Sequence, residues 1–138
     1  MDPSTALVKA RAYCAKQERC RAELRLKLLA WEVEEEKTDA LLAQLEKEGF
    51  LNEGRYAEHF AISKLRQNGW GRIKIRAALR QKQVEDDEIT NAIGSIDTDE
   101  YHRTAQRIAG KRKDPDKVRK LMTGRGFERD VIDRVLRG

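Results

Sequence analysis

The residues most able to do chemistry form an uncompensated run of positive charge. The segment GWGRIKIRAALRQKQV (69–84) contains no acidic residue. Its five cations are Arg72, Lys74, Arg76, Arg80 and Lys82. On a helix the three arginines, four apart, would share one face. Guanidinium groups suit planar recognition of a carboxylate or a phosphate, so this face is interpreted as a binding surface. The alternative is a solvated face without a partner, although such faces usually mix both signs of charge.

A second basic block follows after an acidic link. Residues 83–100 hold seven acidic and no basic residues, whereas 103–125 holds nine basic and two acidic ones. The nine cations are Arg103, Arg107, Lys111, Arg112, Lys113, Lys117, Arg119, Lys120 and Arg125. All but the last are predicted, with the five of the first block, to contact a partner. Two such surfaces would track a long charged partner, a nucleic acid or a protein filament. The alternative for the second block is a frayed, solvated end of the chain.

The sequence offers little support for catalysis. His59 and His102 are the only histidines, and no metal-ligand set, glycine-rich phosphate loop or nucleophile motif accompanies them. Cys14 and Cys20 fit neither a zinc pair nor a disulfide framework and indicate reduced structural thiols. We therefore expect a protein that is not an enzyme and uses no cofactor or metal. No stretch resembles a membrane span or a secretory signal, which predicts a soluble, cytoplasmic protein.

An internal repeat defines the elements that must position these charges. RAELRLKLLAWEV (21–33) aligns without gaps on RIKIRAALRQKQV (72–84), and DPDKVRKLMTGRGF (114–127) forms a third copy. A longer amphipathic stretch precedes each copy and a shorter one follows it. The repeat therefore predicts an all-α protein, an elongated array of three tandem three-helix repeats. The predicted units are 1–50, 51–96 and 97–138.

Local signals and apolar spacing support these elements. Asn52 is a good N-cap, and Gly69 can adopt the left-handed conformation that ends a helix. Trp70 could anchor a base or a partner, or pack against the next helix at the chain reversal. If the array bends, we expect the hinge in the acidic link 83–100. The apolar positions at helical spacing that we expect in the core are Ile62, Leu65, Ile75, Leu79, Ile89 and Ile93.

Three segments resemble the RecX regulatory proteins of bacteria: CRAELRLKLL (20–29), the stretch 48–84 and DDEITNAI (86–93). The middle unit carries the more specific pattern. Its matching residues are Gly49, Leu51, Asn52, Arg55, Tyr56, Ala57, Phe60, Ser63, Gly69, Gly71, Arg72, Ile75 and Leu79. Glu53 and Lys64 depart from that pattern, in which Asp and Arg are common at these positions. The outer units match mainly through the repeat.

The resemblance implies a helical repeat protein that binds the RecA recombinase filament. It would inhibit DNA strand exchange and ATP hydrolysis, and so modulate DNA repair, recombination and the SOS response. It also implies weaker binding to single- and double-stranded DNA, by a monomer without catalytic residues. Two other hypotheses stay open on the residues alone. One is an independent DNA-binding helical module with no specific recombinase partner, and the other is a scaffold for acidic proteins.

Overall fold

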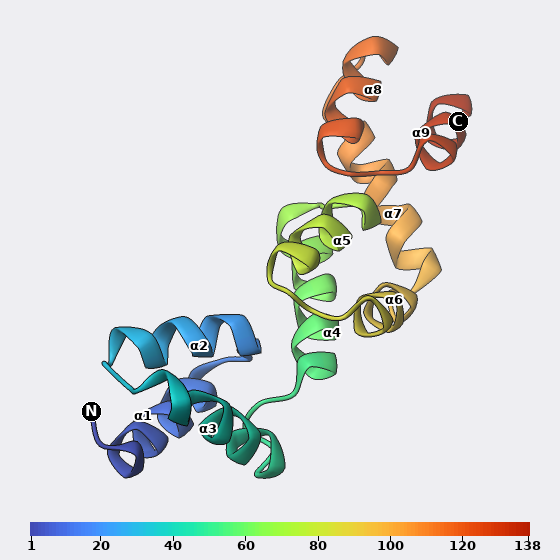
Figure 1. Ribbon diagram of the computed structural model, residues 1–138. Coiled ribbons are helices and arrows are strands. Elements are labelled where there is room, and N and C mark those ends of the chain that lie inside the picture. Colours follow the sequence, from blue (N-terminus) through green and yellow to red (C-terminus); the bar gives the residue numbers. More distant parts are fainter.

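The chain forms an elongated array of helices. The computed structural model describes all 138 residues, as nine α-helices with no strand. The helices are α1 (Pro3–Lys16), α2 (Arg21–Ala30), α3 (Glu35–Lys47), α4 (Glu53–Ser63), α5 (Arg72–Gln81), α6 (Asp86–Gly94), α7 (Thr98–Ala109), α8 (Pro115–Gly124) and α9 (Arg129–Arg137). Figure 1 shows them following one another in groups of three from the N-terminus to the C-terminus. The predicted array of three three-helix units is confirmed, and its boundaries near residues 50 and 96 stay predictions.

The signals around α4 act as the sequence predicts. The Asn52 side chain accepts a hydrogen bond from the Arg55 backbone N–H at 2.9 Å, which caps the start of α4. One π-helical turn, η1 (Lys64–Asn68), continues α4 to Gly69. Gly69 has φ of +64°, a conformation that favours glycine, and the chain reverses there toward α5. The long first helix of the second unit and the turn after it are thus both encoded locally.

The hydrophobic core is divided unequally along the array. Ten buried residues form a cluster in the first unit, whereas 21 form one continuous cluster that runs through the second and third units and includes Cys20 of the first. Ile89, Ile93 and Ile96 of the link 83–100 belong to the larger cluster, and the hinge expected in this link stays a prediction. The predicted core positions are buried except Ile62, which is half-buried. Units two and three share one core, which Cys20 also joins, and the first unit has a second core of its own.

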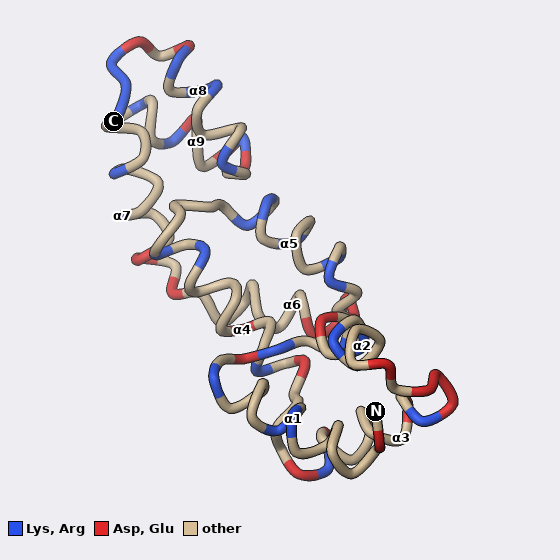
Figure 2. The backbone as a smooth tube through the Cα atoms, turned by 90° about the vertical axis from the view of Figure 1, so that its left-hand side faces the viewer, with Lys and Arg blue, Asp and Glu red and all other residues tan.

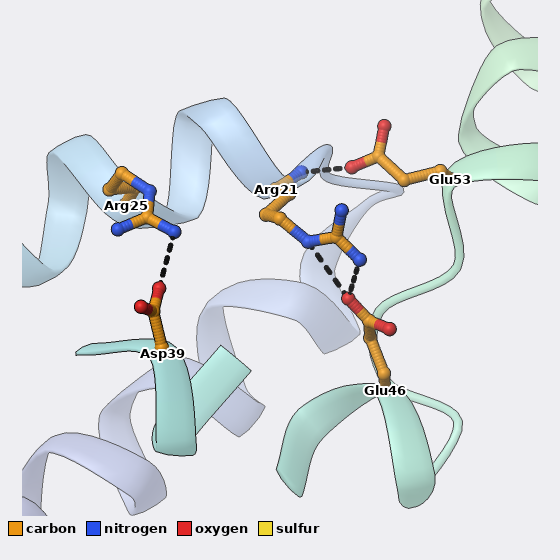
Figure 3. Close-up of polar contacts among 5 residues, drawn as sticks. All are labelled: Arg21, Arg25, Asp39, Glu46 and Glu53. Carbon is orange, nitrogen blue, oxygen red and sulfur yellow. Dashed lines mark hydrogen bonds and ion pairs between the residues drawn. The ribbon is translucent and has the colours of Figure 1, made fainter. Parts of the chain in front are cut away.

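Polar contacts join the first unit to the second (Figure 3). The Arg21 guanidinium at the start of α2 is bonded to Glu46 of α3, and its backbone N–H donates to the Glu53 carboxylate of α4. Arg25, one turn later, pairs with Asp39 at 2.7 Å inside the first unit. Burial raises the pKa of Glu53 above its usual value. Glu53 therefore caps α2 from the neighbouring unit.

Two further ion pairs cross the same junction. Arg55 of α4 donates to Glu18 at 2.6 Å and to the carbonyl oxygen of Gly49 at 2.9 Å. Lys82 at the end of α5 lies 3.7 Å from Glu23 of α2. Arg55 thus holds the link before α4 in place. Charged side chains therefore contact across this junction, beside the apolar packing of Cys20 into the larger core.

The second and third units are joined through their main chains. The N–H of Gly71 donates to the carbonyl oxygen of Arg125 at 2.7 Å, and the N–H of Ile73 donates to that of Gly126 at 3.0 Å. The start of α5 therefore lies directly against the α8–α9 turn. A Cβ on Gly71 would stand 2.4 Å from the Gly126 oxygen, so the approach requires glycine at position 71.

Candidate partner-binding surface

Arg72 belongs to a network between the second and third units. Its Nη1 donates to Glu128 Oε2 at 2.8 Å, and its guanidinium lies 3.8 Å from the centre of the Tyr101 ring. Its backbone N–H donates to the Tyr101 hydroxyl at 2.9 Å, and that hydroxyl donates to Glu128. The Arg72 side chain is 28% exposed. This arginine is therefore neutralised and held by its own protein, and it joins two units.

The same network sets the charge of Glu128. Burial alone would raise the pKa of this carboxyl, but the hydrogen bonds from Tyr101 and Arg72 outweigh burial, and its pKa is lowered. Burial, followed by the bond to Glu128, raises the pKa of Tyr101. At neutral pH the network is therefore an ionised carboxylate facing an arginine and a neutral phenol.

The other two arginines of the predicted α5 face are more available. Arg76 makes no ion pair within 4.0 Å and no side-chain hydrogen bond. Arg80 lies 3.4 Å from Asp86, with both side chains more than half exposed, an arrangement that contributes little energy. The three arginines are thus unequal. Only Arg76 and Arg80 present charge that an external partner could neutralise.

The second basic block lies at the end of α7, in the α7–α8 link and on α8. Arg119 pairs with Asp133 of α9 at 2.8 Å. The other seven residues of this block that are predicted to contact a partner form no ion pair, and their side chains are exposed: Arg103, Arg107, Lys111, Arg112, Lys113, Lys117 and Lys120. Figure 2 shows basic segments along α5 and around α7 and α8, and several acidic segments gathered near the start of α3. The positive surface therefore extends over the second and third units.

The fold brings the two basic blocks together at one place. Lys74 of α5, Arg107 of α7 and Lys111 of the α7–α8 link line one cavity of about 360 Å³ between the second and third units. Arg125 of the α8–α9 turn is the fourth cation there, and it was left out of the predicted contacts. Its position inside the second basic block was the only signal in the sequence. The remaining cations of both blocks are not among the residues that line this cavity.

Trp70 lies at the edge of this cavity and is half-buried. Its ring stands edge-on to Phe60, with centroids 6.4 Å apart. The ammonium groups of Lys64 and Lys74 lie 4.9 and 4.7 Å from its ring centre. The residue packs at the chain reversal, as one hypothesis held, and it keeps exposed surface beside cations, as the other required.

Groups that could support catalysis or metal binding do not converge. The His102 ring stands edge-on to Tyr101 with centroids 6.0 Å apart. His59 lines a different cavity, with Arg55, Glu58 and Arg66 among its walls. No group of three or more His, Cys, Asp or Glu side chains is arranged to hold a metal ion. None of the helices combines the length and the apolar character that crossing a membrane requires.

Comparisons with known proteins agree along most of the chain. Residues 52–93 match the family profile described as RecX, second three-helix domain. Regulatory protein RecX of Leptothrix cholodnii is 33% identical over 133 residues, covering 91% of this chain and 83% of the relative. RecX of Pseudomonas fluorescens is 32% identical, covering 90% and 84%. RecX of Streptomyces coelicolor is 30% identical, covering 99% and 70%.

Solved structures show the same fold. A crystal structure of regulatory protein RecX superposes with a TM-score of 0.88 at 20% identity, covering 99% of this chain and 72% of that one. RecX from Lactobacillus salivarius gives a TM-score of 0.87 at 20% identity, covering 98% and 94%. The matched relatives are named as regulatory proteins, in agreement with the prediction of a non-enzymatic protein. The chain belongs to the RecX family of regulatory proteins.

Proposed function

We propose that this chain binds the filament of a RecA-type recombinase and inhibits its DNA strand exchange and ATP hydrolysis. In this role it would modulate DNA repair and recombination in the cytoplasm, acting as a monomer. One observation carries the proposal: the second and third units, which share a core, both present exposed or half-buried lysines and arginines at their surface. Such a surface suits a long, negatively charged partner. Membership of the RecX family supports this choice of partner.

The shape suggests how inhibition would work. An elongated, bent body could lie along the helical groove of a filament and contact several protomers (Figure 1). Each contact by an exposed lysine or arginine is weak, but contacts on one rigid body add through effective concentration. The body would then obstruct the path of a second DNA molecule. The DNA that the filament carries would supply further, weaker contacts.

The test is the single-stranded-DNA-dependent ATP hydrolysis of a RecA-type recombinase during titration with this protein. The salt concentration is set where this protein no longer binds naked DNA, because phosphate contacts weaken steeply with salt. Inhibition under these conditions is the expected result. Absence of inhibition up to equimolar, folded protein would overturn the proposal and leave an independent DNA-binding module as the better description.

A pair of charge reversals locates the surface. Arg76→Glu should raise the half-inhibiting concentration at least tenfold, which corresponds to about 1.4 kcal/mol. Lys37→Glu is the matched control, because Lys37 is exposed on α3 of the first unit and makes no ion pair. It should leave inhibition unchanged although the net charge changes equally. Full inhibition by folded Arg76→Glu would remove α5 from the interface.

A further inference from the structure

The cavity between the second and third units gathers four cations without a counterion. Lys74 comes from α5, Arg107 from the end of α7, Lys111 from the α7–α8 link and Arg125 from the α8–α9 turn. The other lining residues are Gln67, Asn68, Gly69, Trp70 and Ile108, so no carboxylate faces the cavity. Four positive charges around about 360 Å³ repel one another, and an anionic ligand would relieve that repulsion.

The geometry of the cavity is largely fixed before any ligand arrives. The Arg125 Nη1 donates to the carbonyl oxygen of Asn68 at 2.7 Å, which orients its guanidinium. Main-chain bonds between Gly71 and Arg125 hold the two walls together. Lys74 Nζ lies 3.5 Å from the Gly124 oxygen, a weak contact. One cation is thus preorganised, and the remaining three keep donors free for a ligand.

The chemistry favours phosphate over carboxylate. One carboxylate carries a single charge, whereas a nucleic-acid strand passes successive phosphates through the same space. Arginine with lysine is the usual combination for phosphate contacts. Trp70, a half-buried residue of the cavity lining, offers part of an aromatic ring, a surface on which unpaired bases stack and paired bases do not.

We infer that this cavity binds the phosphodiester backbone of a single nucleic-acid strand, with Trp70 beside an unpaired base. The inference deepens the proposed function, since it locates the weaker DNA contact at one site, separate from Arg76 on α5. It requires no recombinase. Its test therefore uses this protein and DNA alone.

The experiment measures binding of a fluorescent single strand of about 20 nucleotides to the full chain over a range of salt concentrations. Arg107→Ala with Lys111→Ala should weaken binding at least tenfold at low salt. The slope of log affinity against log salt should fall in magnitude by about 1.4, because each phosphate contact contributes about 0.7. Arg103→Ala with Lys113→Ala is the control, which removes the same charge from exposed positions outside the cavity. Equal loss in both variants would overturn the site.

Two additional measurements identify the ligand. Trp31 is the only other tryptophan, so Trp31→Phe leaves Trp70 as the fluorescent reporter. The strand should change this fluorescence over the same concentration range that saturates binding. Unchanged fluorescence would overturn the placement of Trp70 beside an unpaired base. Inorganic pyrophosphate should bind far more weakly. Affinity equal to that of the strand would overturn a strand site in favour of a small phosphate ligand.

The recombinase assay separates this inference from the proposed function. Loss of strand binding by Arg107→Ala with Lys111→Ala supports the cavity whether or not inhibition of the recombinase also weakens, because both residues also belong to the positive surface proposed to face the filament. Unchanged strand binding would overturn the cavity site whatever the recombinase assay shows. Failure of wild-type protein to inhibit, with strand binding lost only in the cavity variant, would overturn the proposed function alone.

Discussion

Replacing Arg72 by alanine should destabilise the second and third units, which it joins. The change removes a charge-assisted hydrogen bond to Glu128 of roughly 1.5 to 3 kcal/mol and a cation–π contact with Tyr101 of about 0.5 to 1 kcal/mol. Because Arg72 and Glu128 are each about a quarter exposed, water recovers part of this loss. We expect the free energy of unfolding to fall by about 2 to 3 kcal/mol.

Urea unfolding, followed by the helical circular dichroism signal, measures this loss. With a slope of roughly 1 to 3 kcal/mol per molar urea, the midpoint should fall by about 1 M or more. Arg76→Ala is the control, because it removes an arginine of the same helix that has no ion pair, and its effect should stay below about 0.5 kcal/mol. Equal midpoints for the two variants would refute the structural role of Arg72.

The difference in free energy of unfolding between wild type and Arg72→Ala should depend on pH in one direction. The pKa of Glu128 is lowered in the folded chain, so its interactions add stability above the ordinary value of 4.5. That stability is lost as the pH falls through the lowered pKa. The gap between wild type and Arg72→Ala should therefore be complete at neutral pH and shrink in acid. A gap that widens in acid would contradict this reasoning.

Three other substitutions or measurements test the junctions. Gly126→Ala should lower the free energy of unfolding by about 1 to 3 kcal/mol, because Gly126 has φ of +86° and a Cβ there would lie 2.3 Å from a side-chain atom of α5. Gly124→Ala is the control, because a Cβ at Gly124 would meet open space. Cys20 is fully buried and burial raises its pKa to about 11, so alkylation at pH 8, followed by mass spectrometry, should require unfolding. Glu53→Ala should lower the free energy of unfolding, measured in urea, by about 1 kcal/mol, because the Arg21 N–H at the start of α2 loses its acceptor. An unchanged urea midpoint would contradict that role.

Local features of the fold could be predicted because they depend on neighbours in sequence. The repeat gave three units of three helices, and the cap at Asn52 and the turn at Gly69 need only adjacent residues. The partner of Arg72 could not be predicted in this way. Glu128 lies 56 residues further along the chain, and helical spacing shows which side chains share a face without showing what covers that face.

The candidate cavity could not be predicted from the sequence either, because it too depends on contacts between distant segments. Each of its cations was visible as part of a charge run, but only the packing of the third unit on the second brings Lys74 beside Arg107 and Arg125. Two of the residues that carry the family resemblance have a structural role. Gly71 and Arg72 both act at the junction between units. A pattern that identifies the family therefore contains many residues that determine its architecture.

The main-chain bonds between α5 and the α8–α9 turn have a consequence for substitutions at the surface. Gly71 and Ile73 donate to carbonyl oxygens, which every amino acid possesses, so these contacts do not depend on the surface charges nearby. Exposed lysines and arginines can consequently be exchanged while the angle between these units is kept. The angle between these units is then independent of the exposed charges, provided that glycine stays at the close approach.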